Sequence, residues 1–163
     1  MSMLGRSIAA PLLILNFIMY CVVLGFASWY LNKLIDGQTY GYGGNGATMF
    51  FVIFSILAGV LGVASKIVGA SHIGAWRTDS SASAAAVANV AWAVTLLAFG
   101  LACKEIHIGG FRGWRLKVLE AFIIALTVTQ FLYLLLLHGG VFISSLGPGR
   151  DDHVVRGPGG ANA

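Results

Sequence analysis

The stretch ATMFFVIFSILAGVLGVAS, residues 47–65, decides the fold of this chain. It lies within a longer run, from Gly37 to Ser65, that contains no Asp, Glu, Lys or Arg. A helix needs about 20 residues to cross the hydrocarbon core of a bilayer, and this run supplies them. Its apolar residues are continuous rather than alternating, which argues against the strands of a membrane barrel. The stretch therefore predicts a transmembrane helix.

Three further charge-free runs have the same character, at residues 7–32, 80–103 and 121–149. Together the four runs predict helices at about residues 8–31, 47–69, 84–103 and 116–138. The expected fold is an all-α integral membrane protein, a four-transmembrane-helix bundle within residues 1–146. The tail, residues 147–163, is rich in Gly and Pro and has little to bury, so we expect it to be disordered.

The composition also points to lipid as the solvent of most of the chain. Hydrophobic residues make up 58% of the sequence and charged residues 10%, whereas a soluble domain has roughly 25% charged residues. The first apolar run is longer than the 7–15 residues of a signal-peptide core, which favours a retained helix. There is no basic stripe, zinc pattern or RNA-binding signature, so we expect no nucleic-acid partner. Cys21 and Cys103 are expected at different depths, which argues against a disulfide.

The orientation of the bundle is weakly specified. Four spans place both termini on one side, and the ten Lys and Arg residues divide five against five between the two sides. The rule that positive loops stay in the cytoplasm therefore gives no preference. Arg6 and the terminal amine precede the first helix, whereas Lys33 is offset by Asp36. This difference favours cytoplasmic termini.

The second predicted helix carries small residues one turn apart, at Ser55, Ala58, Gly59 and Gly62. Such steps let helix backbones approach closely, and packing within one chain is the favoured interpretation over a dimer contact. Lys66 follows near the end of this helix. We expect its long side chain to extend to the lipid headgroups.

Charged residues gather in LACKEIHIGGFRGWRLKVLEAF, residues 101–122, which we expect to join the third and fourth helices. One interpretation is a hairpin whose charges lie in the headgroup layer. The other is a basic mouth that concentrates organic anions, with arginine gripping a carboxylate through two hydrogen bonds.

Glu120 is the most informative residue of this segment. We expect it to be the one carboxylate inside a helix close to the hydrocarbon, and such acids usually face a bundle interior or water. Helical spacing places Thr127, and less closely Gln130, on the same side of the fourth helix. The alternative is an ion pair with Lys117 or Lys104 that only fixes packing.

Single polar residues in apolar helices, such as Asn16, are explained either by interhelical hydrogen bonds or by a path through the bundle. The candidate substrate-binding residues are Glu120, Arg115, Lys117, Lys104, His107, Arg112, Asn89 and Gln130. No histidine or cysteine spacing fits a metal site, so we expect neither a metal nor a cofactor. No nucleophile–base pattern or phosphate-binding loop is present, which predicts that the chain is not an enzyme.

Several stretches resemble the AWPM-type family of small plant plasma-membrane polypeptides induced by abscisic acid. The stretches are LNFIMY, GNGATMFFVIFSILAGVLGVASK, AWRTDS, WAVTLLAFGLACKEIHIGG and RGWRLKVLEAF. The resemblance covers about residues 8–140 and leaves out the tail. It implies four membrane helices, a plasma-membrane location and a role in abscisic-acid, dormancy and osmotic-stress responses. Uptake of abscisic acid has been attributed to the family.

Two hypotheses of function follow. In the first, the protein facilitates uptake of abscisic acid, whose carboxylate would meet the basic mouth and whose ring would meet apolar side chains, with Glu120 or His107 handling a coupled proton. In the second, it is a structural tetraspan protein that organises membrane lipids during dehydration. Because a four-helix bundle is narrow, transport would require a homo-oligomer or a lateral groove.

Overall fold

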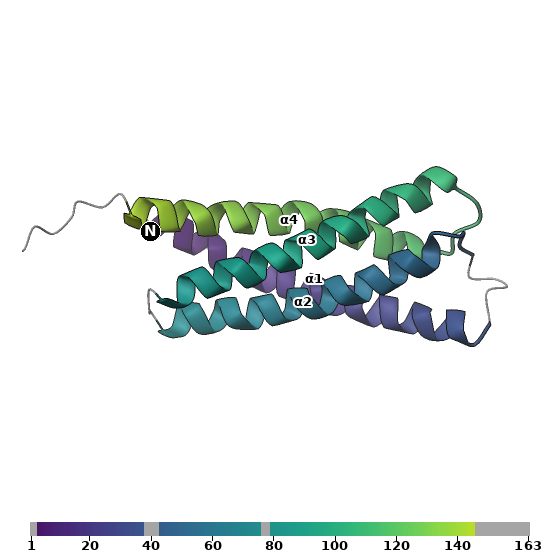
Figure 1. Ribbon diagram of the computed structural model, residues 1–163, viewed down its shortest axis with the longest axis horizontal. Helices are drawn as coiled ribbons and strands as arrows, with labels where there is room; N and C mark the ends of the chain where they lie inside the picture. Colours follow the sequence, from purple (N-terminus) through teal and green to yellow (C-terminus); the bar gives the residue numbers. More distant parts are fainter. Residues whose placement is uncertain (1–2, 38–42, 76–78, 146–163) are drawn as a thin grey trace, which may run out of the picture.

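The computed structural model describes residues 3–37, 43–75 and 79–145. These residues form four long helices, shown in Figure 1: α1 (Met3–Ile35), α2 (Thr48–Ala75), α3 (Asp79–Ile108) and α4 (Trp114–Ser145). Each contains a segment long and apolar enough to cross a membrane, at Ala10–Ile35, Thr48–Ala70, Ala85–Ile108 and Trp114–Gly139. The prediction of a four-helix membrane bundle is confirmed. The predicted tail, residues 147–163, lies outside the described residues.

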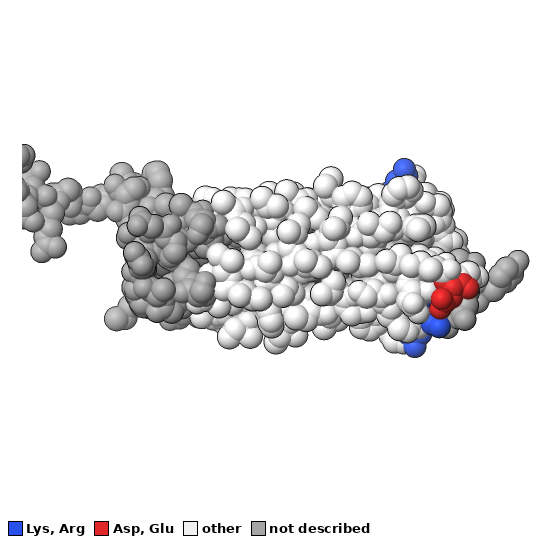
Figure 2. All heavy atoms as spheres, turned by 60° about the horizontal axis from the view of Figure 1, so that its bottom comes forward, with Lys and Arg blue, Asp and Glu red and all other residues white. Residues whose placement is uncertain are grey.

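The helices pack in a ring in chain order. α1 and α3 each contact both α2 and α4. The chain segments that follow α1 and α3 meet at one end of the bundle, here called the loop end, whereas α1 begins and α4 ends at the opposite end (Figure 1). The outer surface is mainly apolar, with exposed side chains such as Ile18, Val60 and Leu97. On the face shown in Figure 2, the Lys, Arg, Asp and Glu side chains that are described gather at the loop end.

The small residues of α2 serve packing within the chain, as predicted. Ser55, Ala58, Gly59 and Gly62 are all buried. A Cβ atom added to Gly62 would lie 2.3 Å from the ring of Tyr20 on α1, closer than atoms can approach. Only glycine at position 62 therefore leaves room for the Tyr20 ring between α1 and α2. Cys21 and Cys103 are both free, in agreement with the prediction of no disulfide.

Two connecting segments pair with each other and close the loop end. Gly43 and Arg112 form an antiparallel bridge, and the Gly44 amide donates a hydrogen bond to the Phe111 carbonyl at 2.9 Å. The Tyr30 hydroxyl donates to the Gly43 carbonyl at 2.6 Å. Gly43 has a φ of 76°, and a side chain there would collide with the Phe111 carbonyl. The bridge therefore requires glycine at position 43.

Local capping sets the helix ends at this pairing. Before α2, the Asn45 side-chain oxygen accepts a hydrogen bond from the Ala47 amide at 2.9 Å, and the Asn45 amide donates to Thr48 Oγ1 at 2.7 Å. These are the reciprocal bonds of a helix N-terminus. α3 ends where Gly109 adopts a φ of 70°, the usual left-handed stop. Because α3 continues past residue 103, it carries Glu105 into the bundle.

Candidate functional site

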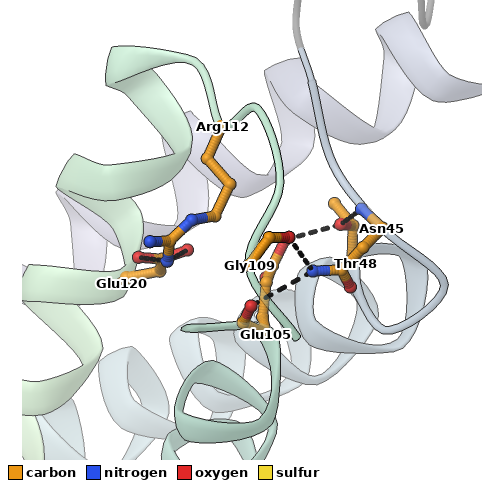
Figure 3. A network of polar contacts seen from close by, with 6 residues as sticks. All are labelled: Asn45, Thr48, Glu105, Gly109, Arg112 and Glu120. Carbon is orange, nitrogen blue, oxygen red and sulfur yellow. Dashed lines mark hydrogen bonds and ion pairs between the residues drawn. The ribbon is translucent and has the colours of Figure 1, made fainter. Parts of the chain in front are cut away.

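The first polar cluster lies at the loop end and comprises Thr48, Glu105, Arg112 and Glu120, here called the carboxylate cluster (Figure 3). Glu120 is 4% exposed. Nη1 of Arg112 donates to both of its oxygens, at 3.1 and 2.9 Å. The predicted partners, Lys117 and Lys104, were wrong, because both side chains are exposed on the outer surface. Arg112 is the partner because the connecting segment folds it back over the first turns of α4.

Glu105 is a second buried acid, so the prediction that Glu120 is the one carboxylate within a helix was wrong. Its exposure is 0%, and its Oε1 accepts a hydrogen bond from the Thr48 hydroxyl at 2.5 Å. Its Oε2 has no partner among the described residues. The sequence contained a signal for this burial: Ala91, Ala98 and Ala102 precede Glu105 at helical spacing, and all three are buried.

The second polar cluster lies in the opposite half of the bundle and comprises Asn16, Lys66, Gln130 and Tyr133, here called the lysine cluster. Lys66 is 1% exposed, so the prediction that it extends to the headgroups was wrong. Its ammonium donates to Gln130 Oε1 at 2.5 Å and lies 3.7 Å from the centre of the Tyr133 ring. The side chain turns inward because α2 presents this position to α4 rather than to lipid.

Gln130 connects α4 to the three other helices within the lysine cluster. Its side-chain oxygen also accepts a hydrogen bond from the Asn16 amide at 3.4 Å, and its amide donates to the Ala88 carbonyl at 3.4 Å. Asn16 Oδ1 is buried without a partner among the described residues. Both Asn16 and Gln130 thus make interhelical hydrogen bonds, the first of the two interpretations given above for single polar residues in apolar helices.

A mainly apolar layer separates the two clusters. Between them Tyr20 bonds Thr95 at 3.0 Å, and buried apolar side chains, including Val23, Ile123 and Leu126, fill the remaining interior. Asn89, which we expected to line a path, is instead exposed on the outer surface of α3. In the part of the chain that the structure describes, the polar side chains thus form separate layers.

A shallow groove of about 480 Å³ lies on the outer surface between α1 and α4, and we call it the aromatic groove. Its lining residues are Cys21, Val22, Gly25, Phe26, Trp29, Trp114 and Arg115. Gly25 leaves open space at its centre, since an added Cβ would meet nothing within 4 Å. Phe26 and Trp114 meet edge to face, with ring centres 6.4 Å apart.

Arg115 is the charged residue of the aromatic groove. Its guanidinium carbon lies 4.1 Å from the centre of the Trp29 ring and 5.1 Å from that of Trp114. Within the described residues Arg115 makes these ring contacts and no hydrogen bond, which leaves its N–H groups available to an anion. The groove therefore offers one cation above an apolar, aromatic slot.

The predicted substrate-binding residues thus fall in four different places. Arg112 and Glu120 meet in the carboxylate cluster, Gln130 belongs to the lysine cluster, and Arg115 lies in the aromatic groove. The remaining four are exposed on the outer surface: Asn89, Lys104, His107 and Lys117. Sequence reasoning missed Glu105 and Lys66, which occupy the interior with Arg112, Glu120 and Gln130.

The fold and these clusters define a four-helix integral membrane protein with ionisable side chains inside its bundle. The profile of the AWPM-19-like family matches residues 14–140, and the chain belongs to this family. It is 60% identical over 144 residues to membrane protein PM19L of Oryza sativa subsp. japonica, an alignment that covers 87% of this chain and 83% of that protein. No solved structure matches the chain. The predicted family is confirmed, and the chain is a plant membrane protein.

Proposed function

We propose that this protein facilitates the uptake of abscisic acid, a weak carboxylic acid with an apolar ring, across the plant plasma membrane. The observation that carries the proposal is the aromatic groove, which combines the free N–H groups of Arg115 with the rings of Phe26, Trp29 and Trp114. Its volume of about 480 Å³ falls in the range of small-molecule sites.

The groove suits a ligand with a charged head and an apolar body. The carboxylate binds the guanidinium edge, where two parallel hydrogen bonds give both affinity and orientation. The ring follows α1 from Trp29 toward Cys21, a rise of about 12 Å along the helix. Because the groove faces lipid, the acid moves along the boundary between protein and bilayer, and a central pore is not needed.

The buried ionisable side chains give this proposal further support. Ionisable side chains are costly to place inside a membrane, and they usually mark substrate or proton pathways. Glu105, Glu120 and Lys66 are all buried in the interior of the bundle.

The second candidate is a structural tetraspan protein that organises the plasma membrane during dehydration. Close packing favours it: Gly62 sits against the Tyr20 ring, and the groove is shallow and open rather than enclosed. In this function the outer apolar surface binds lipid and the buried polar bonds hold the helices together.

Uptake of labelled abscisic acid into liposomes containing the purified chain tests the two candidates. We expect faster uptake than in protein-free liposomes, and slower uptake in Arg115→Ala. Lys117→Ala is the matched control, since it removes a cation from the same turn of α4 outside the groove. Uptake equal to that of empty liposomes would contradict the carrier proposal. Equal losses of uptake in both variants would show that the aromatic groove is not the binding site.

A further inference from the structure

The carboxylate cluster contains two acids and one base. Glu105 is faced by Tyr30 from α1, by Thr48 at the start of α2, by Arg112 from the connecting segment and by Glu120 from α4. Arg112 binds both oxygens of Glu120 through Nη1. Figure 3 shows its guanidinium turned to Glu120, and Glu105 next to Thr48. Among the described residues, Glu105 therefore has no ion pair of its own.

The hydrogen bonds of Glu105 are also incomplete. The Thr48 hydroxyl gives its single hydrogen to Oε1, because its oxygen already accepts the Asn45 amide. Oε2 is buried with no partner in residues 3–37, 43–75 and 79–145. An ionised carboxylate oxygen buried without a donor is one of the costlier arrangements in a protein, and more so inside a membrane.

We propose that Glu105 is the proton-binding residue of the bundle. While the two connecting segments are paired, Glu105 is the neutral acid and Oε2 carries the proton. When the loop end opens to water, the O–H bond breaks, the electron pair stays on the carboxylate, and the proton passes to a water molecule. That this step accompanies uptake of a weak acid rests on the proposed function; the proton site itself does not.

The loop end is built so that the charge of Glu105 affects its closure. The Asn45 side-chain amide, which precedes α2, donates to the carbonyls of Glu105 and Gly109, at 3.1 and 3.3 Å. The Thr48 hydroxyl holds the Glu105 side chain from the same segment. A negative Glu105 repels Glu120 and competes with it for Arg112. Protonation therefore favours the paired state, and deprotonation favours its opening.

Infrared difference spectroscopy tests the proton site without transport. The full chain is placed in lipid nanodiscs and titrated, and the carbonyl stretch of protonated carboxylic acids that exchange slowly in D₂O is followed. We expect one such component in the wild type and its loss in Glu105→Gln, because glutamine has nearly the same size as glutamate but carries no titratable proton. Asp36→Asn removes an exposed acid and is the matched control, with the component retained. A component that persists in Glu105→Gln would overturn the assignment.

Thr48 gives a second test if Glu105→Gln fails to fold. Thr48→Val keeps the side-chain shape but removes the hydroxyl that donates to the carbonyl oxygen Oε1, so the carbonyl stretch of the component should move to higher frequency. Thr48→Ser retains the hydroxyl and should keep the wild-type frequency. Identical frequencies in Thr48→Val and the wild type would contradict a proton on Glu105.

Liposome uptake separates this inference from the proposed function. Uptake that depends on a pH gradient in the wild type and loses that dependence in Glu105→Gln supports both. If the slowly exchanging infrared component is lost in Glu105→Gln but the wild type transports no abscisic acid, the proton site stands and the carrier proposal fails. If uptake in Glu105→Gln still depends on a pH gradient, the carrier proposal stands and Glu105 is not its proton site.

Discussion

The carboxylate cluster and the lysine cluster bury charge in opposite ways. Glu120 and Gln130 mark their positions on α4, ten residues or about 15 Å apart. At the loop end an arginine neutralises one acid, and a hydroxyl holds the other. In the opposite half, Lys66 has an amide oxygen and an aromatic face as its partners, and no carboxylate among the described residues.

The difference shows what each cluster is able to do. The carboxylate cluster has one acid more than its base can balance, and it lies beneath the paired connecting segments at the loop end. In the described part of the chain, the lysine cluster contains one base, Lys66, and no carboxylic acid, and it is enclosed by helices. A change of charge at the loop end requires only a local opening of the connecting segments, whereas a change at Lys66 requires helices of the bundle to separate. Exchange with water is therefore easier at the loop end.

The largest expected effect is that of Arg112→Ala, which breaks the carboxylate cluster. It leaves Glu120 buried beside Glu105 without a cation, and loss of one partner of a buried pair costs about 3–5 kcal/mol. Unfolding in detergent by SDS titration measures the loss. The double variant Arg112→Met/Glu120→Leu removes both charges and should recover most of the stability. A double variant as unstable as Arg112→Ala would show that packing, not charge, is responsible.

Gly62→Ala should have the next largest effect, because it disturbs the layer between the two clusters. The new methyl group would lie 2.3 Å from the Tyr20 ring and would push α1 from α2, at a cost of about 1–3 kcal/mol. Gly100→Ala is the matched control, since an added Cβ there meets nothing within 4 Å. It should leave the stability unchanged or raise it, as alanine favours helix. Equal losses in the two variants would mean that α1 and α2 are not in close contact at Gly62.

Tyr30→Phe should have a smaller effect, confined to the loop end. It removes the hydrogen bond from the Tyr30 hydroxyl to the Gly43 carbonyl, a net contribution of about 1 kcal/mol. Amide hydrogen exchange should accelerate at Gly44, whose amide pairs with Phe111, and stay unchanged near Lys66. Faster exchange throughout the chain would instead indicate that the loop pairing holds the whole bundle.

Lys66→Met should have the smallest effect on stability, which sharpens the contrast with Arg112→Ala. Methionine fills a similar volume, and removal of a buried charge that lacks a counter-ion offsets the lost hydrogen bond to Gln130. We expect the free energy of unfolding to change by less than about 1 kcal/mol. A loss as large as that of Arg112→Ala would mean that Lys66 is bound as tightly as an ion pair.

Part of the site was accessible from sequence. Buried Glu120 and Gln130 were predictable because polar residues in an apolar helix usually turn inward for partners, although Asn89 does not. Lys66 was misplaced because a lysine near a helix end usually reaches water, and only its contacts across the bundle with Gln130 and Tyr133 of α4 decide otherwise. The Arg112 partner of Glu120 depends on the path of a connecting segment, for which no helical periodicity exists.

The sequence by itself determined the number of helices, their approximate spans and the family, because burial in lipid requires long charge-free runs that any hydropathy count detects. It also determined that α2 packs closely, since small residues one turn apart permit little else. Only the tertiary structure decided which charges face inward and which partners they find. Those choices depend on helix rotation and loop pairing, and these are set by contacts between residues far apart in the chain, such as Thr48 with Glu105.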